Sequence, residues 1–450
     1  MDADLQQALW DSTSLAGLQW ALTGERSNAA LREAIAVLLP PASAPGTIRI
    51  HRAKYKPGRY LQTYYDVALP DGNRQVEVNW LPAGAADPRG PADERQAMQA
   101  EALERGLAAP FRALATEAPD WGMYVQVAPL DVEFPQLVRT SDPQYVGAML
   151  RGVEGTLADA EHRASAIRYR PGQRHVLRYD VVGHPEATLF AKVYNSDKGA
   201  RTFGVVTRMA DWLAAQGGLQ TVKPSAYLPD DQLVLYPLVT GTPLSELLRA
   251  PGEATNRLLR ETGAALAALH RAPLDIIELK PHSFEKEVKG VVSASEHVHP
   301  LLPDVGRTID SLVSRARALH ERLPQEPPAF AYGDFKADHL WDTPDGLMLI
   351  DFDTCYLFDP AIDLGKFLAD IQFWYDGYGH AGAEQAQEQF LAGYGDAPDG
   401  RVLRGRLYEA LVLLKSTVRR VKLFDPNWAS RTTRLIDRAS AVLDEIERAA

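Results

Sequence analysis

A thirteen-residue stretch of the chain occurs twice, 114 residues apart. Residues 55–67 and residues 169–181 align without a gap, and six of the thirteen positions are identical. Both copies hold a Pro-Gly pair between segments typical of strands, and both continue as a turn, a strand, a helix and two further strands. A gapless match followed by the same element order favours a duplicated unit over two unrelated hairpins that share a common turn. The repeat therefore predicts two related α+β units.

The remaining sequence predicts where these units end. A chain of 450 residues is long enough for two or three domains with a sizeable core. The first copy lies within residues 1–150, the second within residues 151–240, and residues 241–450 have mostly helical spacing of their apolar positions. We therefore predict an N-terminal domain over 1–150, a second sheet-containing domain over 151–240 and a helical domain over 241–450.

Charge and cysteine content limit the kinds of partner. The chain has 48 basic and 59 acidic residues, a formal charge of −11, which argues against nucleic acid or an anionic membrane as the main partner. Cys355 is the one cysteine and excludes an intramolecular disulfide. The N-terminal segment lacks the features of a signal peptide, and no apolar run approaches the roughly 18 residues that span a bilayer. We expect a cytoplasmic protein.

Two carboxylates stand in an order that suits phosphoryl transfer. Asp334 lies in the short loop 332–339, and Asp351 follows twelve residues after that loop, behind an apolar strand. Phosphoryl transfer needs one group that orients the attacking hydroxyl and another that holds the metal-bound triphosphate in line with it. Protein kinases place their catalytic base and their metal ligand in this same order. Either aspartate alone is also typical of a turn or a helix cap.

A lysine in the second copy fits phosphate binding. Lys192 is centred in the apolar and aromatic segment 189–194, where an ammonium group requires a partner. Its position matches the third-strand lysine of kinases, which contacts the α- and β-phosphates. The alternative is an exposed lysine on an edge strand. In the first copy the offset of 114 leads to Val78, so we expect that copy not to bind ATP in this way.

Together with the segment 236–241 and the run 359–364, these motifs resemble the aminoglycoside phosphotransferase family of small-molecule kinases, over roughly residues 165–370. The resemblance implies an α+β, protein-kinase-like bilobal fold, with an antiparallel-sheet N-lobe and a helical C-lobe. Residues 1–150 then form an N-terminal α+β cap that looks like a degenerate second N-lobe. This cap is similar in placement to the caps of bacterial maltokinases and glucosamine kinases.

The resemblance also implies an activity, which is ATP-dependent phosphate transfer to a hydroxyl of a sugar, an aminosugar, an aminoglycoside-like molecule or a related metabolite. By motif position, Asp334 looks like the base, Asp351 looks like the ligand of Mg²⁺, and Lys192 looks like the phosphate-binding lysine. Asp363 resembles the buried aspartate that braces the catalytic loop. Lys336 stands where protein kinases carry a lysine that contacts the transferring phosphate, although a solvated loop lysine is the plainer alternative.

The rest of the expected ATP site has weaker signals. Tyr236 and Leu238 lie in a segment that looks like a hinge, whose backbone meets adenine. Gly172 lies in a turn that has one glycine and not the three of the usual phosphate loop, and Arg174 adds charge beside it. An aromatic and acidic region at 370–380 either lines the acceptor site or only packs in the interior.

Three positions depart from the family pattern. His339 stands where asparagine is usual, and imidazole is a poor ligand for Mg²⁺, which prefers oxygen. Either His339 binds a softer ion such as Mn²⁺, or it acts through water, or Asp338 or Asp353 supplies the missing oxygen. We favour Asp353 from the sequence. Tyr332 replaces a histidine that serves in packing and hydrogen bonding, so we expect that change to be tolerated.

The third departure concerns the partner of Lys192. The helix expected at 199–215 contains no glutamate, and Asp211 is its one acid. This gap and His339 motivate a rival hypothesis, a pseudokinase or nucleotide-binding regulatory protein without turnover. A protein kinase is a second rival, but the helical insert at 275–328 suits small-molecule kinases better. The sequence does not name the acceptor or the oligomeric state.

Overall fold

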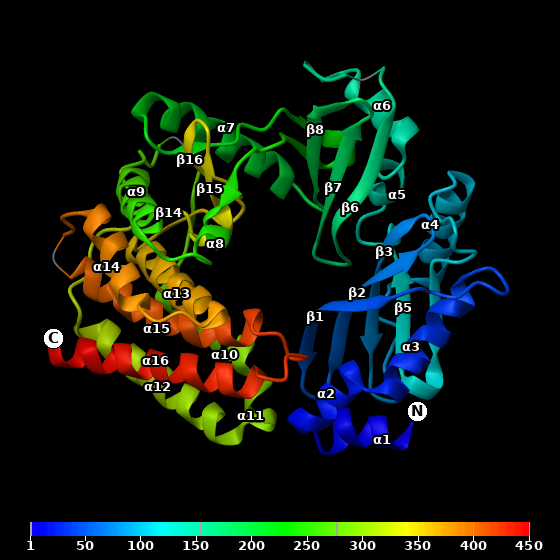
Figure 1. Cartoon of the computed structure of the whole chain (residues 1–450), viewed down its shortest axis with the longest axis horizontal. Coiled ribbons are helices and arrows are strands. Elements are labelled where there is room, and N and C mark those ends of the chain that lie inside the picture. Colours follow the sequence, from blue (N-terminus) through cyan, green and yellow to red (C-terminus); the bar gives the residue numbers. More distant parts are fainter. Residues whose placement is uncertain (1, 154, 158, 276–277, 399, 450) are drawn as a thin grey trace. The chain divides into compact units, whose positions relative to one another are not determined.

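The computed structural model describes residues 2–153, 155–157, 159–275, 278–398 and 400–449. Figure 1 shows the helices and strands, coloured along the chain. The chain divides into two compact units, and each is described by itself. Unit 1 comprises Met1–Phe203, Pro224–Leu238 and Lys422–Pro426; unit 2 comprises Gly204–Lys223, Val239–Val421 and Asn427–Ala450. Both copies of the sequence repeat therefore lie in unit 1, and the domain boundaries at 150 and 240 stay a prediction.

Unit 1 is built on two antiparallel five-stranded sheets with helices before, between and after them. The first part contains α1 (Ala3–Gln6), η1 (Gln7–Asp11), α2 (Leu15–Thr23), α3 (Glu25–Leu38), β1 (Ile48–Lys56), β2 (Tyr60–Leu69), β3 (Gly72–Trp80), α4 (Ala92–Glu104), β4 (Ala115–Ala118), η2 (Pro119–Trp121), β5 (Met123–Val127), α5 (Gln136–Thr140) and α6 (Pro143–Leu150). The second part contains β6 (His162–Arg170), β7 (Arg174–Val181), β8 (His184–Val193), the start of α7 (Lys198–Gln216), β10 (Ala226–Leu228), η3 (Pro229–Asp231) and β11 (Leu233–Pro237).

The two sheets have the same topology. The first has the strand order β1-β2-β3-β5-β4, and the second has the corresponding order β6-β7-β8-β11-β10. A long helix follows the third strand in each, and a short 3₁₀ helix joins the last two strands. Register agrees as well: Ile48 lies opposite Val67 in the first hairpin, and His162 lies opposite Val181 in the second, 114 residues later. A bulge interrupts both hairpins. The N-terminal part is therefore a second copy of the same unit, as the repeat predicted.

One residue assignment within this comparison was wrong. Lys192 of β8 lies opposite Val176 of β7. The counterpart of Val176 in the first copy is Gln62, and its partner on β3 is Asn79, not Val78. The β7–β8 register shifts near its turn while β2–β3 pairs continuously, so the gapless offset of 114 ends at that turn. The first copy therefore has an uncharged asparagine at the position of Lys192, and the expectation that it lacks the phosphate-binding lysine is unchanged.

The second sheet buries one of its faces. Apolar residues of β7, β8 and β11 on that face, including Leu177, Ala191 and Leu233, form one cluster with Leu137 of α5 and Leu150 of α6. Alternation of side chains along a strand places Lys192 on the opposite face. Helices α5 and α6, which lie between the two copies in the chain, therefore cover one face of the second sheet.

Unit 2 is mainly helical and contains two small sheets, with the strand orders β12-β15-β16-β9 and β13-β17-β14. Its strands are β9 (Gln220–Thr221), β12 (Thr242–Pro243), β13 (Lys280–Pro281), β14 (Ala329–Ala331), β15 (Leu340–Thr343), β16 (Gly346–Leu349) and β17 (Tyr356–Phe358). Besides the end of α7, its helices are α8 (Leu244–Leu247), α9 (Glu253–Leu269), α10 (Phe284–Ser295), α11 (Val298–Leu301), α12 (Pro303–Arg322), η4 (Ala337–His339), α13 (Ala361–Tyr378), α14 (Ala383–Tyr394), α15 (Arg401–Arg420) and α16 (Trp428–Ala449).

Helix α13 lies at the centre of unit 2. It packs against α14 and α15, and most of its side chains are buried. Gly365 permits this close approach, because a Cβ atom there would lie 2.4 Å from the Cβ of Tyr408 on α15. None of the helices in the described part of the chain is long and apolar enough to cross a membrane. The expected α+β class is confirmed, with antiparallel sheets in unit 1 and a helical unit 2.

Candidate active site

A buried carboxylate on α13 fixes the backbone of the loop 332–339. Asp363 is fully buried, and its two oxygens accept hydrogen bonds from the backbone N–H groups of Tyr332 and Gly333, each at 2.7 Å. A buried carboxylate is costly unless such donors compensate its charge, and two backbone donors do so here. Asp363 therefore makes the bracing contacts that were expected of it.

Gly333 is required by the space around it. Its φ is +81°, in the left-handed region, and a Cβ atom would lie 2.5 Å from the ring of Tyr356 and 2.7 Å from the carbonyl oxygen of Thr354. The carbonyl oxygen of Gly333 accepts a hydrogen bond from Nζ of Lys366 on α13. The residue before Asp334 is thus held by contacts on both sides of its peptide.

Asp334 projects from this fixed backbone. Its Oδ2 lies 2.7 Å from Nζ of Lys336 and 3.7 Å from Nδ1 of His339, and its side chain is 39% exposed. Burial acts to raise the pKa of Asp334, but the charges of Lys336 and His339 outweigh it. Lys366 acts in the same direction, and the net result is a pKa below the ordinary value. Asp334 is therefore an ionised carboxylate at neutral pH, and it can still be reached by a solute.

Tyr332 joins the two aspartate-bearing segments. Its hydroxyl is hydrogen-bonded to the carbonyl oxygen of Ile350, lies 2.8 Å from that of Asp351, and lies 3.0 Å from Nδ1 of His339. The ring is completely buried, and burial raises the pKa of Tyr332 well above its ordinary value, so the group remains a hydroxyl. The tyrosine thus makes hydrogen bonds across the site, in line with its expected role.

Asp351 has an unusual backbone. It follows β16, and its φ of +71° is one that residues other than glycine rarely adopt. Such strain costs on the order of 1–3 kcal/mol and is often found at functional sites. Its Oδ2 lies 3.6 Å from Nε2 of His339. His339 therefore stands between the two carboxylates, with one ring nitrogen toward each.

The three predicted metal ligands, His339, Asp351 and Asp353, are close together in the chain but do not form a complete metal site among the described residues. Among the residues that the structure describes, no group of three or more His, Cys, Asp or Glu side chains is arranged to hold a metal ion. Metal ions at phosphate-transfer sites typically take one or two protein ligands and complete their coordination with phosphate oxygens and water. Nε2 of His339 and Oδ2 of Asp351, which belong to two of the predicted ligands, lie 3.6 Å apart. Asp353, the third predicted ligand, is partly buried two residues later.

Three of the predicted nucleotide-binding side chains share one face of the second sheet in unit 1. Lys192 lies opposite Val176 of β7, and Arg174 is two positions before Val176, so Arg174 and Lys192 point to the same side. Tyr236 of β11 shares this side by the same alternation, and Nζ of Lys192 lies 5.4 Å from the centre of its ring. This is the face opposite the apolar cluster.

Two backbone N–H groups near this face already have acceptors. The N–H of Gly172 donates to Oδ2 of Asp131 at 2.9 Å, and the N–H of Leu238 donates to the carbonyl oxygen of Thr188 at 3.1 Å. Asp131 lies in the segment after β5, in the first copy of the repeat. In this conformation both N–H groups already donate to protein oxygens, so neither is available to a nucleotide.

Asp211 does not fill the gap left by the missing glutamate. Its Oδ1 forms an ion pair with Nζ of Lys223 at 2.7 Å, and both side chains are exposed. The doubt raised from the sequence about Asp211 as a partner for Lys192 is therefore consistent with the structure.

Sequence reasoning missed several residues that support the loop. Oδ2 of Asp370 accepts the backbone N–H of Ala337 at 2.7 Å, and Arg420 forms an ion pair with Asp370. Arg420 also lies 3.6 Å from Oδ2 of Asp338. Lys366 had a local signal, because it follows Asp363 by three residues and so lies on the same side of a helix. Arg420 had none, since it is 50 residues from Asp370.

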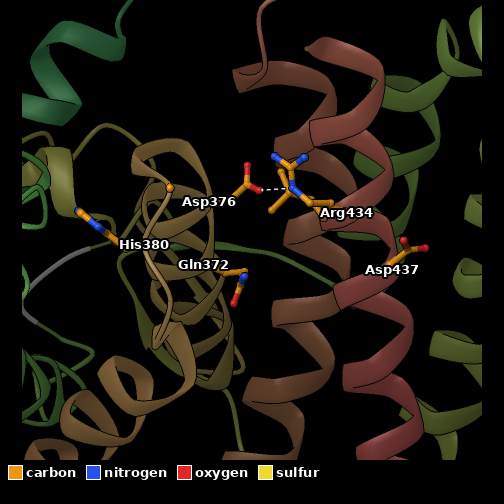
Figure 2. Close-up of a pocket in the computed structure, with 7 residues that line it drawn as sticks. Gln372, Asp376, His380, Arg434 and Asp437 are labelled. Carbon is orange, nitrogen blue, oxygen red and sulfur yellow. Dashed lines mark hydrogen bonds and ion pairs between the residues drawn. The ribbon is translucent and has the colours of Figure 1, made fainter.

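The aromatic and acidic region 370–380 lines a pocket of about 530 Å³ in unit 2. Figure 2 shows the pocket between the end of α13 and helix α16, with Arg434 reaching across to Asp376. Arg434 Nε and Asp376 Oδ1 are 2.7 Å apart, and Arg431 pairs with the second oxygen at 3.1 Å. The pocket is lined by Gln372, Asp376, Gly379, His380, Arg434, Leu435 and Asp437.

Comparison with known proteins gives one family match. A model described as the phosphotransferase enzyme family matches residues 166–406, which is more than half of the chain. The match begins in the second copy of the repeat and includes the loop 332–339, Asp351 and the first turns of α15. No curated protein matches the chain.

The solved structures that the chain matches include an aminoglycoside phosphotransferase and two proteins of choline-kinase type. A thermostable aminoglycoside phosphotransferase mutant in ternary complex with AMP-PNP and hygromycin B is 16% identical, covers 67% of this chain and 97% of its own, and has a TM-score of 0.43. A choline/ethanolamine kinase family protein from Mesorhizobium loti is 16% identical, with coverages of 69% and 97% and a TM-score of 0.45. Choline kinase from Cryptosporidium parvum is 14% identical, with coverages of 67% and 96% and a TM-score of 0.44.

Proposed function

The chain belongs to the phosphotransferase enzyme family, and from this premise we propose that it transfers the γ-phosphoryl group of ATP directly to a hydroxyl of a small molecule. The observation that carries the proposal is the arrangement of Asp334 and Asp351 on the two sides of His339, held together by the hydroxyl of Tyr332. This arrangement suits a reaction in which correct positioning and charge stabilisation supply most of the rate.

Asp334 is the group proposed to orient the acceptor hydroxyl. Its lowered pKa keeps it ionised, so one of its oxygens can accept the hydrogen bond of a substrate O–H. A carboxylate with a low pKa is a weak base, which is sufficient where proton transfer follows most of the phosphoryl movement. The rigid support from Asp363 and Gly333 fixes the direction in which Asp334 projects.

Lys336 is proposed to stabilise the transferring group. Its ammonium is 2.7 Å from Oδ2 of Asp334, so it lies where the attacked phosphoryl group must come. A cation fixed there before the reaction neutralises charge on the phosphoryl oxygens without reorganisation. The same ion pair favours the position of the Lys336 ammonium beside Asp334.

The nucleotide is proposed to bind along the face of the second sheet that carries Lys192, Arg174 and Tyr236. Lys192 and Arg174 supply positive charge for the phosphates, and Tyr236 and Leu238 border the adenine position. Gly172 can join them only if its N–H exchanges the carboxylate of Asp131 for a phosphate oxygen. Asp351, with His339 or Asp353, would hold a divalent ion, which supplies positive charge to the triphosphate when bound.

The acceptor is proposed to be a sugar, an aminosugar or an aminoglycoside-like molecule that approaches from the side of α13. Asp370 contacts the catalytic loop at Ala337. Asp376 of the pocket follows Asp370 by six residues, which is about 9 Å along α13 and about 240° around it. An acceptor that contacts both the loop and the pocket must therefore extend partly around the helix. The charged and polar lining of the pocket offers hydrogen bonds to hydroxyl and amino groups.

Single-turnover phosphate transfer tests this proposal. The full chain is mixed with ATP labelled in the γ-position, with Mg²⁺ and separately with Mn²⁺, over a panel of sugars, aminosugars and aminoglycosides. Labelled phosphate is expected on one class of acceptor and is expected to fall strongly in Asp334→Asn. Exchange of Asp345 for Asn, on an exposed turn of unit 2, serves as the control. Equal transfer by the Asp334→Asn variant contradicts the proposal.

A nucleotide-binding protein without turnover is the second candidate. His339 in place of the usual asparagine and the absence of a glutamate from α7 favour it, because both departures fall at positions expected to serve turnover. In the same experiment this candidate predicts that ATP raises the melting temperature of the chain while no acceptor is labelled. Under this candidate, ATP raises the melting temperatures of wild type and Asp334→Asn equally, and neither protein labels an acceptor.

A further inference from the structure

The hydroxyl of Tyr332 has one proton and three close neighbours. Two of the neighbours are the carbonyl oxygens of Ile350 and Asp351, and the third is Nδ1 of His339 at 3.0 Å. A carbonyl oxygen can only accept a hydrogen bond. If the hydroxyl donated to Nδ1, neither of the two close carbonyl contacts would have a proton, so the hydroxyl donates to one of the carbonyls. Toward His339 the hydroxyl therefore acts as an acceptor.

This assignment fixes the tautomer of His339. If the hydroxyl of Tyr332 accepts, Nδ1 of the imidazole must carry the hydrogen. Oδ2 of Asp334 lies 3.7 Å from the same nitrogen, and its negative charge also favours a proton there. In the neutral ring the lone pair is then on Nε2, the nitrogen that lies toward Asp351. Hydrogen bonds to the other ring nitrogen commonly orient metal-binding histidines in this way.

The remaining pair of atoms can reach one ion. Nε2 of His339 and Oδ2 of Asp351 are 3.6 Å apart. Bonds from a divalent ion to imidazole nitrogen and to carboxylate oxygen are each about 2.1 Å long, so the two bonds together exceed this separation. An ion can therefore contact both atoms with little movement of either side chain.

We propose that Nε2 of His339 and Oδ2 of Asp351 bind the divalent ion of this site together, and that the site therefore prefers Mn²⁺, or a similar ion that accepts nitrogen ligands, over Mg²⁺. The inference rests on the proposed function, because that function requires a metal-bound nucleotide. It differs from the sequence-based preference for an oxygen from Asp353.

The preference follows from ligand chemistry. Mg²⁺ is a hard cation that favours oxygen and loses its water reluctantly, whereas divalent ions of the first transition row accept imidazole, Mn²⁺ more weakly than Fe²⁺, Ni²⁺ or Zn²⁺. An asparagine at position 339 would offer an amide oxygen, which suits Mg²⁺. The histidine replaces that oxygen by nitrogen while Tyr332 holds the ring in the orientation that metal binding requires.

Spectroscopy of bound Mn²⁺ tests the inference without any need for turnover. Mn²⁺ is bound to the full chain in the presence of ADP, and pulsed electron paramagnetic resonance detects whether a nitrogen nucleus is coupled to the ion. Affinities for Mn²⁺ and Mg²⁺ are measured by competition in wild type and in His339→Asn. His320→Asn, whose ring stacks on Phe284 in another part of unit 2, is the matched control.

We expect nitrogen coupling in wild type and in His320→Asn, and its loss in His339→Asn. The ratio of Mn²⁺ affinity to Mg²⁺ affinity is expected to fall about tenfold or more in His339→Asn, since loss of an outer hydrogen-bond partner alone changes metal affinity by about 10- to 100-fold. Melting temperatures without metal identify any variant that is simply misfolded.

Two results overturn the inference. One is Mn²⁺ bound with no nitrogen coupling, or with coupling that persists in His339→Asn, because His339 is then not a ligand. The other is the absence of any ADP-dependent metal binding, which also contradicts the proposed function. Nitrogen coupling without phosphate transfer to any acceptor supports the inference while the proposed function fails, so the two failures are distinguishable.

Discussion

The backbone N–H of Gly172 donates a hydrogen bond of 2.9 Å to Oδ2 of Asp131. Gly172 belongs to the turn of the second copy that is expected to meet phosphate, and Asp131 belongs to the first copy. The same carboxylate oxygen lies 2.7 Å from Nε2 of His175, and both of these side chains are buried. The first copy thus holds the turn with a carboxylate placed where a phosphate oxygen is expected to bind.

Replacing Asp131 by leucine should destabilise unit 1. The substitution keeps the branched shape of the side chain but leaves the donors of Gly172 and His175 without an acceptor, and each buried unsatisfied donor costs about 1–3 kcal/mol. Urea unfolding measures the loss. Asp120→Leu on the exposed 3₁₀ turn is the control, and surface changes of this kind usually stay within about 0.5 kcal/mol. Equal unfolding free energies of the two variants would show that the hydrogen bonds contribute nothing.

The repeat provides a matched pair of glycines for the turn itself. Gly172 and Gly58 occupy the same place in their hairpins, and both have a φ of +67°. Replacing either by alanine should cost about 1–2 kcal/mol of unfolding free energy, because an L-residue is strained in this region. Only Gly172→Ala should raise the KM for ATP, as the first copy lacks the lysine. A similar increase in Gly58→Ala would contradict the assignment of the second copy as the nucleotide-binding one.

Features that depend on local pattern could be predicted from the sequence. The repeat was visible because both copies keep the Pro-Gly turn and the strand residues beside it. Asp334 and Asp351 were visible because the chemistry fixes their order and spacing along the chain. Asp363 was expected from the family resemblance alone, and its contacts with the loop are those expected.

Features that depend on packing between distant segments could not be predicted. Asp131 and Gly172 are 41 residues apart, and no periodicity relates them. Asn79, and not Val78, corresponds to Lys192 because the register between β7 and β8 shifts near their turn, and the sequence does not show where that shift occurs. The tautomer of His339 depends on two carbonyl oxygens that share the hydroxyl of Tyr332, and a sequence contains no sign of that geometry.

Glu77 should make the stability of unit 1 depend on pH. Burial raises the pKa of this β3 side chain from 4.5 to about 8, and the charge of Asp131 adds to the effect. Hydrogen bonds, one of them from Gln62 at 2.7 Å, act in the opposite direction but do not restore the ordinary value. Because the folded state holds the proton more tightly, its stabilisation is fully present below about pH 4.5 and is lost as pH rises through about 8.

Melting temperatures at pH 5, 6, 7 and 8 measure this dependence. Wild type should lose stability across the series, and Glu77→Gln should lose less, because glutamine is neutral at every pH. Glu94→Gln on the exposed side of α4 is the control and should behave as wild type. Parallel curves for wild type and Glu77→Gln would contradict the raised pKa.

Asp334→Asn should abolish most catalysis without unfolding the protein. The amide keeps the size of the side chain and is partly exposed, so the free energy of unfolding should change little. It cannot accept the substrate proton and holds Lys336 only weakly, so kcat should fall by about 10²- to 10⁴-fold, the usual contribution of a positioned proton acceptor. KM for ATP should change little, because Asp334 is assigned to the acceptor hydroxyl. A large increase in that KM with kcat unchanged would instead place Asp334 in nucleotide binding.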